Sequence, residues 1–293
     1  MSQGGSAPTP TRSSHQSFPV SVNAANGEIR IAQRPDHIVS LSPTATEMLF
    51  AIGAGDQVVA ADQYSTYPPQ APTTKLSGYQ PNVEAIATYN PDLVVISNDI
   101  GGLVKSLGKL SVPVLLEPAA KNLDDTYAQI EQLGEATGHL GAAVHLVASM
   151  KSTIQQLVES APRFSHPLTY YHELDQTYYA AGSNTFVGQL YGLLGMRNIA
   201  DETKGASGGY PQLSAEYIIK ADPDVIFLAD TKCCGQSAKT VAKRPGWDQI
   251  RAVKDGAVFG LDDDIVSRWG PRVVDFLKVV VQDLDRLHES VSS

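Results

Sequence analysis

The chain has 293 residues, a length that allows one large domain or two domains of ordinary size, each with its own core. Hydrophobic residues make up 42% of it and charged residues 18%, which is typical of a globular protein. No stretch approaches the ~20 consecutive apolar residues that are needed to cross a membrane. The formal net charge of −9, without any run of Lys and Arg, argues against a nucleic-acid-binding surface.

The first sixteen residues, MSQGGSAPTPTRSSHQ, are rich in Gly, Ser, Thr and Pro and show no apolar periodicity. Such a segment buries too little surface to offset the entropy lost on ordering, so residues 1–16 are predicted to be a flexible tether. No signal peptide is visible, and a tether of this kind fits a mature secreted or lipid-anchored protein without its leader.

From residue 28 onward, short β-branched runs alternate with amphipathic helical stretches. Within residues 17–121 the predicted strands are HIVSLS, QVVAAD, PDLVVIS and VPVLLEP, and the predicted helices are TEMLFAIGAG, NVEAIATYN and LVKSLGKLS. This alternation is the pattern of βαβ units, and near-continuous apolar strands are typical of a parallel sheet that is covered on both faces. The predicted fold class is therefore α/β, with Rossmann-like lobes built around central parallel sheets.

The same alternation returns in residues 164–293, from LTYYHEL to the final helix VVDFLKVVVQDLDRL. One phrase nearly repeats, because NVEAIATYNPDLVVIS at 82–97 is echoed by SAEYIIKADPDVIFLA at 214–229. Internal repetition at this separation predicts two lobes of the same design, an N-terminal lobe over 17–121 and a C-terminal lobe over 164–293.

Residues 122–163 separate the two lobes and are predicted to be helical. Asn122 suits an N-cap, and Asp124 and Asp125 suit the first turn of a helix because of its dipole. Beyond Gly138 the spacing predicts a second helix of roughly 22 residues, about 33 Å long. Its apolar face would comprise Ala143, Val147, Met150, Ile154 and Leu157. We expect this helix to join the lobes and to keep their relative motion small.

Several phrases, in this order and spacing, resemble one protein family. They are RPDHIVSLSPTATEMLFAIGAGDQVVAADQYSTYPPQA, LSGYQPNVEAIATYNPDLVVIS, YYAAGSNTFVGQLYGLLGMRNIAD, YPQLSAEYIIKADPDVIFLAD and RPGWDQIRAVKDGAVFGLDDDIVSRWGPRVVDFL. Over roughly residues 28–285 the chain looks like the solute-binding proteins of ABC importers that have a single long interlobe helix and capture cobalamin, ferric siderophores or haem. The stretch through DQYSTYPPQA is most similar to cobalamin-binding members, whereas SRWGPR is also similar to siderophore binders.

The resemblance implies a monomeric extracytoplasmic protein, periplasmic or attached to the outer face of the membrane as a lipoprotein. It would carry a metal chelate to a membrane permease and its ATPase, and it would need no cofactor of its own. Cobalamin is the first ligand that we expect, with a ferric siderophore or haem as the alternative.

Two rival interpretations stay open. A binder of bare zinc or manganese ions would need several converging histidines, and only His172 is well placed for that, so no metal site is predicted. An enzyme or a sensor on the same fold is the other rival. For the enzyme, the sequence offers no GxSxG elbow, P-loop or GxGxxG fingerprint.

The resemblance places a ligand cleft between the lobes, at the carboxyl ends of the strands, where α/β folds present binding groups. In the N-terminal lobe, Ser42 and Thr44 lie between a strand and a helix, where their hydroxyls either meet ligand oxygens or cap the helix. Tyr64, Tyr79 and Gln80 are further cleft candidates, since large flat ligands are held mainly by apolar and stacking contacts.

The C-terminal lobe supplies its cleft candidates from the ends of strands and from glycine turns. They are His172, Glu173 and Tyr178 in YYHELDQTYY, Asn184 and Phe186 in GSNTFVGQL, and Tyr210 in GYPQL. Arg268 and Trp269 in SRWGPR add a cation and an indole, which suit an anionic chelate and a flat ring. Arg272 is expected to pair within the helix that follows.

Two pairs of residues complete the predictions. Glu84 and Glu216 occupy the same place in the repeated phrase, and the resemblance implies that they dock onto arginines of the permease; a solvated acid favoured by the helix dipole is the alternative. Cys233 and Cys234 are the two cysteines of the chain. Adjacent cysteines either close a vicinal disulfide in an oxidising compartment or remain two small thiols in a loop.

Overall fold

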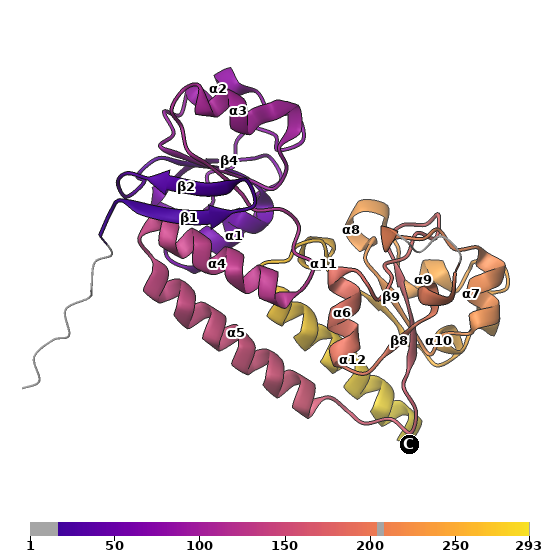
Figure 1. The fold of residues 1–293 in the computed structure, drawn as a ribbon. Helices are drawn as coiled ribbons and strands as arrows, with labels where there is room; N and C mark the ends of the chain where they lie inside the picture. The colour runs from indigo at the N-terminus through magenta and orange to yellow at the C-terminus, as the bar shows by residue number, and fades with distance from the viewer. Residues whose placement is uncertain (1–16, 204–207, 293) are drawn as a thin grey trace, which may run out of the picture.

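The computed structural model describes residues 17–203 and 208–292. Two α/β lobes, each with a four-stranded parallel sheet, are joined by long helices that run between them (Figure 1). This arrangement confirms the predicted fold class. The predicted tether, residues 1–16, lies outside the described residues.

The N-terminal lobe carries a sheet in the order β4-β3-β5-β6, in which every neighbouring pair is parallel. Strands β3 and β5 are buried along their whole length, as their continuous apolar runs predict. The elements of this lobe are β1 (Val20–Ala24), β2 (Gly27–Ile31), β3 (Ile38–Leu41), α1 (Pro43–Ala51), β4 (Val58–Ala61), α2 (Val83–Ala87), β5 (Leu93–Ile96), α3 (Leu103–Gly108) and β6 (Val114–Leu116).

The C-terminal lobe repeats this topology. Its sheet has the order β10-β9-β7-β8, again with parallel neighbours, so that each sheet has its second, first, third and fourth strands side by side. The repeated phrase forms α2 and β5 in one lobe and α7 and β9 in the other, which confirms the predicted repeat. The elements are β7 (Thr169–Glu173), α6 (Phe186–Leu193), β8 (Arg197–Asn198), α7 (Ala215–Ala221), β9 (Val225–Leu228), α8 (Thr231–Cys234), α9 (Ala238–Val241), α10 (Arg251–Lys254), β10 (Val258–Gly260) and α11 (Asp263–Val266).

Helices α4 (Leu123–Thr137) and α5 (Leu140–Ser160) lie between the two lobes in the chain, and α12 (Val273–Ser292) follows the second lobe and packs on α5. The side chain of Asn122 accepts a hydrogen bond from the Asp125 N–H, as predicted, and Gly138 ends α4 with a left-handed φ of 80°. Helix α5 buries Ala143, Val147, Met150 and Ile154 of the predicted apolar face, with Leu157 partly buried, and packs along α12. Figure 1 shows α5 running from one lobe to the other. Buried apolar residues of both lobes form one continuous cluster along these helices.

Strands β1 and β2 form an antiparallel hairpin that the sequence analysis did not predict. The hairpin attaches to the edge strand β6, because the Asn26 side chain bonds the Val114 carbonyl at 2.9 Å and the Leu116 N–H at 3.1 Å. It also packs against α4. The hairpin therefore helps to hold the start of the interlobe helices on the N-terminal lobe.

Helices α4 and α5 approach each other closely at Gly134. A Cβ added at this glycine would collide with the Cβ of Ala143 and lie 3.1 Å from the Cα of Leu140. Well-packed helices have no room for an extra methyl group at such a contact. A glycine is therefore required where the chain turns from the lobe into the interlobe helix.

We predict that Gly134→Ala lowers the free energy of unfolding by about 1–3 kcal/mol, because the helices must separate to admit the methyl group. The matched control is Gly141→Ala on α5, where an added Cβ meets nothing within 4 Å. There the alanine should leave stability unchanged or raise it by up to ~1 kcal/mol. Urea denaturation followed by circular dichroism measures both, and equal stabilities of the two variants would contradict the close packing.

Candidate functional site

The predicted site residues gather where strands of both sheets end. Ser42 follows β3 directly, and Tyr64 lies in the loop after β4. In the other lobe Glu173 is the last residue of β7, and Asp230 follows β9. The carboxyl ends of the central strands are the usual ligand-binding edge of such sheets.

The hydroxyl-rich turn after β3 is buried and bonded within the N-terminal lobe. Ser42 is 1% exposed and caps α1 by accepting a hydrogen bond from the Ala45 N–H, and Thr44 is 3% exposed. The Thr46 hydroxyl lies 2.8 Å from that of Ser40 and 2.9 Å from that of Ser65. The helix-cap alternative therefore describes Ser42. The other hydroxyls bond one another and hold the turn after β3 in place.

Two exposed tyrosines of the N-terminal lobe lie in the segment between β4 and α2. Tyr64 and Tyr79 meet edge to face with their ring centroids 5.8 Å apart, and they are 50% and 67% exposed. The backbone N–H groups of Tyr79 and Gln80 both donate to the Ser77 hydroxyl, at 3.2 and 3.1 Å, which holds their loop in place. The side chain of Gln80 is exposed as well.

In the C-terminal lobe, exposed tyrosines lie on two neighbouring loops. Tyr210 is 55% exposed and Tyr179 is 41% exposed, and Tyr179 forms a bridge with Gln212, so the two loops adjoin. Tyr178, in contrast, stacks on the buried Trp247 with centroids 5.7 Å apart. The sequence analysis therefore selected the inward-facing member of the pair, and Tyr179 is the one that faces outward.

The turn before α6 also differs from its prediction. Thr185, rather than Asn184, is the N-cap, accepting a hydrogen bond from the Gly188 N–H. Asn184 is left exposed, whereas Phe186 is half-buried and packs against the main core. Of these two candidates, only Asn184 is free to meet a ligand without rearrangement.

His172 and Glu173 lie inside the C-terminal lobe and not on its surface. The Nδ1 atom of His172 lies 2.9 Å from the Tyr191 hydroxyl, and burial lowers the pKa of this histidine to about 4. The carboxylate of Glu173 accepts two hydrogen bonds of 2.6 Å from the Arg244 guanidinium. Direct ligand contact by these two residues stays a prediction, and it would require the lobe to open.

A second buried carboxylate lies beside this ion pair. Asp230 is fully buried, and burial, with the neighbouring charge of Glu173, raises its pKa to about 7. Neither of its oxygens has a hydrogen-bond partner among the described residues. The guanidinium of Arg244 also lies over the Trp247 ring, 4.5 Å from its centroid, and is therefore the cation that compensates this cluster.

The SRWGPR segment contacts the N-terminal lobe through its two arginines. Arg268 donates to Glu47 of α1 at 2.6 Å, and Arg272 binds the same carboxylate at 2.6 and 2.8 Å. Glu47 is buried. Arg268 is thus bound in an ion pair and is not free for an anionic ligand. The prediction that Arg272 pairs within its own helix is wrong, because its guanidinium binds Glu47 of the other lobe instead.

Trp269 takes part in the same interlobe contact. Its indole N–H donates to the Gln129 side chain at 2.9 Å, and its carbonyl accepts a bond from the Thr126 hydroxyl, also at 2.9 Å. Both partners lie on α4. Trp269 is therefore fastened to α4 and packs, partly buried, against the main core.

The sequence analysis did not predict the interlobe role of Glu47. Its signal is a charged side chain inside an apolar helical stretch, TEMLF, where burial requires a partner. Nothing local identifies that partner, which lies more than two hundred residues further along the chain.

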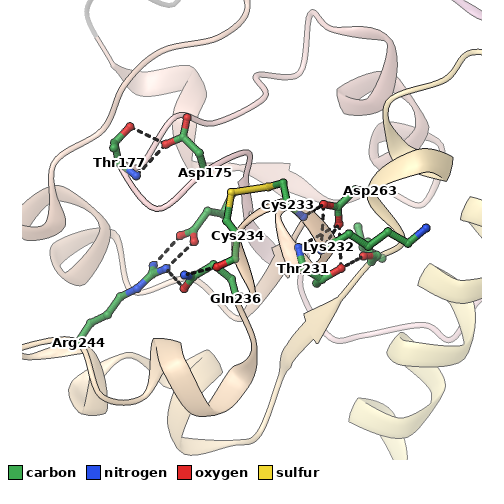
Figure 2. The surroundings of a disulfide bond; sticks show 11 residues. Asp175, Thr177, Thr231, Lys232, Cys233, Cys234, Gln236, Arg244 and Asp263 are labelled. Carbon is green, nitrogen blue, oxygen red and sulfur yellow. Dashed lines mark hydrogen bonds and ion pairs between the residues drawn. A yellow bond between two sulfur atoms is a disulfide. The ribbon is translucent and has the colours of Figure 1, made fainter. Parts of the chain in front are cut away.

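Cys233 and Cys234 are joined in a disulfide in α8, as the first of the two alternatives states (Figure 2). Both residues are exposed. They follow the end of β9, the same strand end that carries Asp230.

The glutamates of the repeated phrase occupy matching positions. Glu84 and Glu216 are both exposed in the first turn of α2 and α7, two residues after the N-caps Asn82 and Ser214. Hydrogen bonds from its own backbone N–H and from the Ser214 hydroxyl lower the pKa of Glu216. Each lobe thus presents one acid at an equivalent site.

Within residues 17–203 and 208–292, no three His, Cys, Asp or Glu side chains are grouped so that they would hold a metal ion. Over the same residues no helix has both the length and the apolar content needed to cross a membrane.

Comparison with known proteins gives the family. A model of the family described as "Periplasmic binding protein" matches residues 38–265, most of both lobes. The chain belongs to this family. It is an ABC substrate-binding protein of the group whose members bind vitamin B12, haem or iron complexes.

Three similar proteins illustrate the relationship. The ABC transporter substrate-binding lipoprotein YvrC of Bacillus subtilis is 33% identical, over 91% of this chain and 86% of its own length. A cobalamin-binding protein of Halobacterium salinarum is 32% identical, over 88% of this chain and 72% of its own. The crystal structure of a possible iron-binding, periplasmic solute-binding protein from Staphylococcus epidermidis is 28% identical, with a TM-score of 0.75 over 86% of this chain and 99% of that one.

We predict that Glu47→Gln lowers the free energy of unfolding by about 3 kcal/mol, because it leaves two guanidinium groups facing a neutral amide in a buried site. The control is Glu28→Gln, which changes an exposed glutamate of β2 and should change stability by less than ~0.5 kcal/mol. Denaturant unfolding of both variants is the measurement. A loss no larger than that of the control would show that the interlobe ion pairs contribute little.

Proposed function

We propose that the protein captures a metal chelate, with cobalamin as the first candidate, outside the cytoplasm and delivers it to the permease of an ABC importer. The observation that supports this proposal is the set of exposed tyrosines on the strand-end loops of both lobes, Tyr64 and Tyr79 on one and Tyr179 and Tyr210 on the other. Aromatic rings combine a large apolar contact area with a polar tip, which suits a flat macrocycle that carries polar groups at its edge.

The family relationship favours a corrinoid among the chelates. The cobalamin-binding protein of Halobacterium salinarum is among the proteins most similar to this chain. Several polar residues at the strand ends are bonded internally, including Ser42, His172 and Arg268, so contact by ring faces fits this surface better than ligation by charged side chains.

A ferric siderophore or haem is the second candidate. It is supported by the likeness to the Staphylococcus epidermidis protein and by the exposed phenol groups, since a tyrosine oxygen is a suitable axial ligand for ferric iron. In either case the metal belongs to the transported ligand, and the protein is proposed to have no cofactor of its own. Bare zinc or manganese ions are a poorer match because the described residues offer no cluster of ligands.

The proposed partners follow from the same family. We propose that a single copy of the chain, held at the outer face of the membrane as a lipoprotein, meets the permease through Glu84 and Glu216. These two acids are exposed and equivalent in the two lobes. Separated charges of this kind steer and orient an encounter without a large buried area. Catalysis and sensing are not part of this proposal.

We predict saturable quenching of tryptophan fluorescence by cyanocobalamin at ~1 μM protein, with haemin and a ferric siderophore titrated in parallel. Tyr64→Ala should weaken binding by about tenfold, since it removes one aromatic face. Leu110→Ala is the control, because this exposed residue precedes β6 at the opposite end of the sheet. Saturation by an iron complex alone would favour the second candidate, and no saturation by any of the three would contradict the proposal.

We also predict that Glu84→Lys combined with Glu216→Lys abolishes uptake in cells while ligand affinity stays within about twofold of the wild type. The control carries the same charge change at two other exposed glutamates, Glu28→Lys with Glu159→Lys. Normal uptake by the first double variant would remove the docking assignment and leave the binding proposal intact.

A further inference from the structure

The disulfide segment is bonded to the first turn of α11, the short helix that precedes α12. The carboxylate of Asp263 accepts hydrogen bonds from three consecutive backbone N–H groups, those of Thr231 at 3.0 Å, Lys232 at 3.0 and 3.1 Å, and Cys233 at 2.9 Å. Figure 2 shows this carboxylate next to the disulfide. The position of residues 262–264 thus depends on the backbone conformation of α8.

Lys232 extends the contact towards the other lobe. Its ammonium group lies 2.7 Å from Asp262 and 2.8 Å from Asp264. Asp264 in turn accepts a bond of 3.2 Å from Arg268, which reaches Glu47 of the N-terminal lobe. A continuous chain of ion pairs therefore runs from the residue next to the disulfide to the interlobe contact.

A second chain of contacts starts on the other side of the disulfide. The Gln236 side chain donates to the Cys234 carbonyl at 3.4 Å and accepts a bond of 2.8 Å from Arg244 (Figure 2). Arg244 also binds Glu173. Arg244 is the cation that compensates the buried acids at the ends of β7 and β9. Both chains of contacts meet in the segment that the disulfide closes.

Closure of adjacent cysteines restricts the backbone more than a distant cross-link does. The two sulfurs, the two Cβ atoms and the peptide unit between them form one ring, so the dihedral angles of both residues are coupled. A dithiol reductant opens the ring by exchange: the S–S bond breaks, two thiols form on the protein, and the reductant becomes a disulfide. Both cysteines are exposed to such a reagent.

We propose that residues 231–236 are a redox-sensitive positioning element, in which the closed disulfide holds the start of α11, residues 262–264, so that Arg268 stays on Glu47. Reduction frees the backbone of α8, weakens its bonds to Asp263 and the ion pairs of Lys232, and loosens the contact between the lobes. Ligand affinity then falls in a reducing environment. This last step rests on the proposed function, whereas the loosening of the lobes does not.

The test that needs no ligand is hydrogen–deuterium exchange of the full chain, oxidised and after reduction with dithiothreitol. We expect reduction to raise exchange at least about threefold in residues 262–272 and in α1, with β1 and β2 unchanged. Acceleration confined to residues 231–237 would overturn the proposal, because the effect would then stay local.

Two variants test the disulfide and the ion pairs of Lys232 separately. Cys233→Ser with Cys234→Ser should match the reduced protein and no longer respond to dithiothreitol. Lys232→Met keeps the disulfide but removes the ion pairs, and it should accelerate exchange in α1 as well; Lys239→Met, at an exposed lysine of α9, is its control. Equal exchange of Lys232→Met and its control in α1 would also overturn the proposal.

Affinity is measured with cyanocobalamin, haemin and a ferric siderophore on the oxidised wild type and on the double serine variant, which avoids mixing a reductant with a metal complex. We expect the serine variant to bind about three- to tenfold more weakly. Equal affinity would contradict the coupling to the ligand site. Binding of none of the three probes by either protein would contradict the proposed function and leave the exchange experiment to decide the redox inference.

Discussion

The arrangement of the two lobes depends on one interaction, in which the buried carboxylate of Glu47 is bound by two guanidinium groups from the opposite lobe. An isolated carboxylate in such a place would cost several kcal/mol, so α1 is stable in its position only while Arg268 and Arg272 remain beside it. The two arginines lie between the C-terminal sheet and α12, so the C-terminal half of the chain supplies the partners of a buried charge in the N-terminal lobe. Trp269, bonded to α4, strengthens the same junction.

This junction explains how the polar residues of the strand ends are used. Hydroxyls after β3 bond one another, the carboxylate of Glu173 holds Arg244, and Arg268 holds Glu47. These polar groups thus stabilise the strand ends of the two lobes, whereas Tyr64, Tyr79, Tyr179 and Tyr210 stay exposed there. A continuous apolar core along α5 and α12 makes the lobes one body, which favours a preformed ligand site over a hinged one.

Much of the fold follows from local patterns, and much of the site does not. Apolar runs and helical spacing locate the strands of both sheets and the face of α5, because burial acts on each element separately. The hairpin was missed although Asn26-Gly27 between alternating residues is a turn signal. The orientations of Glu173 and Arg268 depend on partners that lie 71 and 221 residues away in the sequence. No local pattern identifies partners so distant along the chain.

Small-angle X-ray scattering of the free and the ligand-loaded protein tests the central claim that the two lobes act as one body. If the ion pairs of Glu47 and the interlobe helices hold the lobes as described, the two radii of gyration should agree within about 0.5 Å, since closure amounts to a few degrees. A decrease of about 2 Å or more on loading would show a hinged, closing protein and would contradict this account.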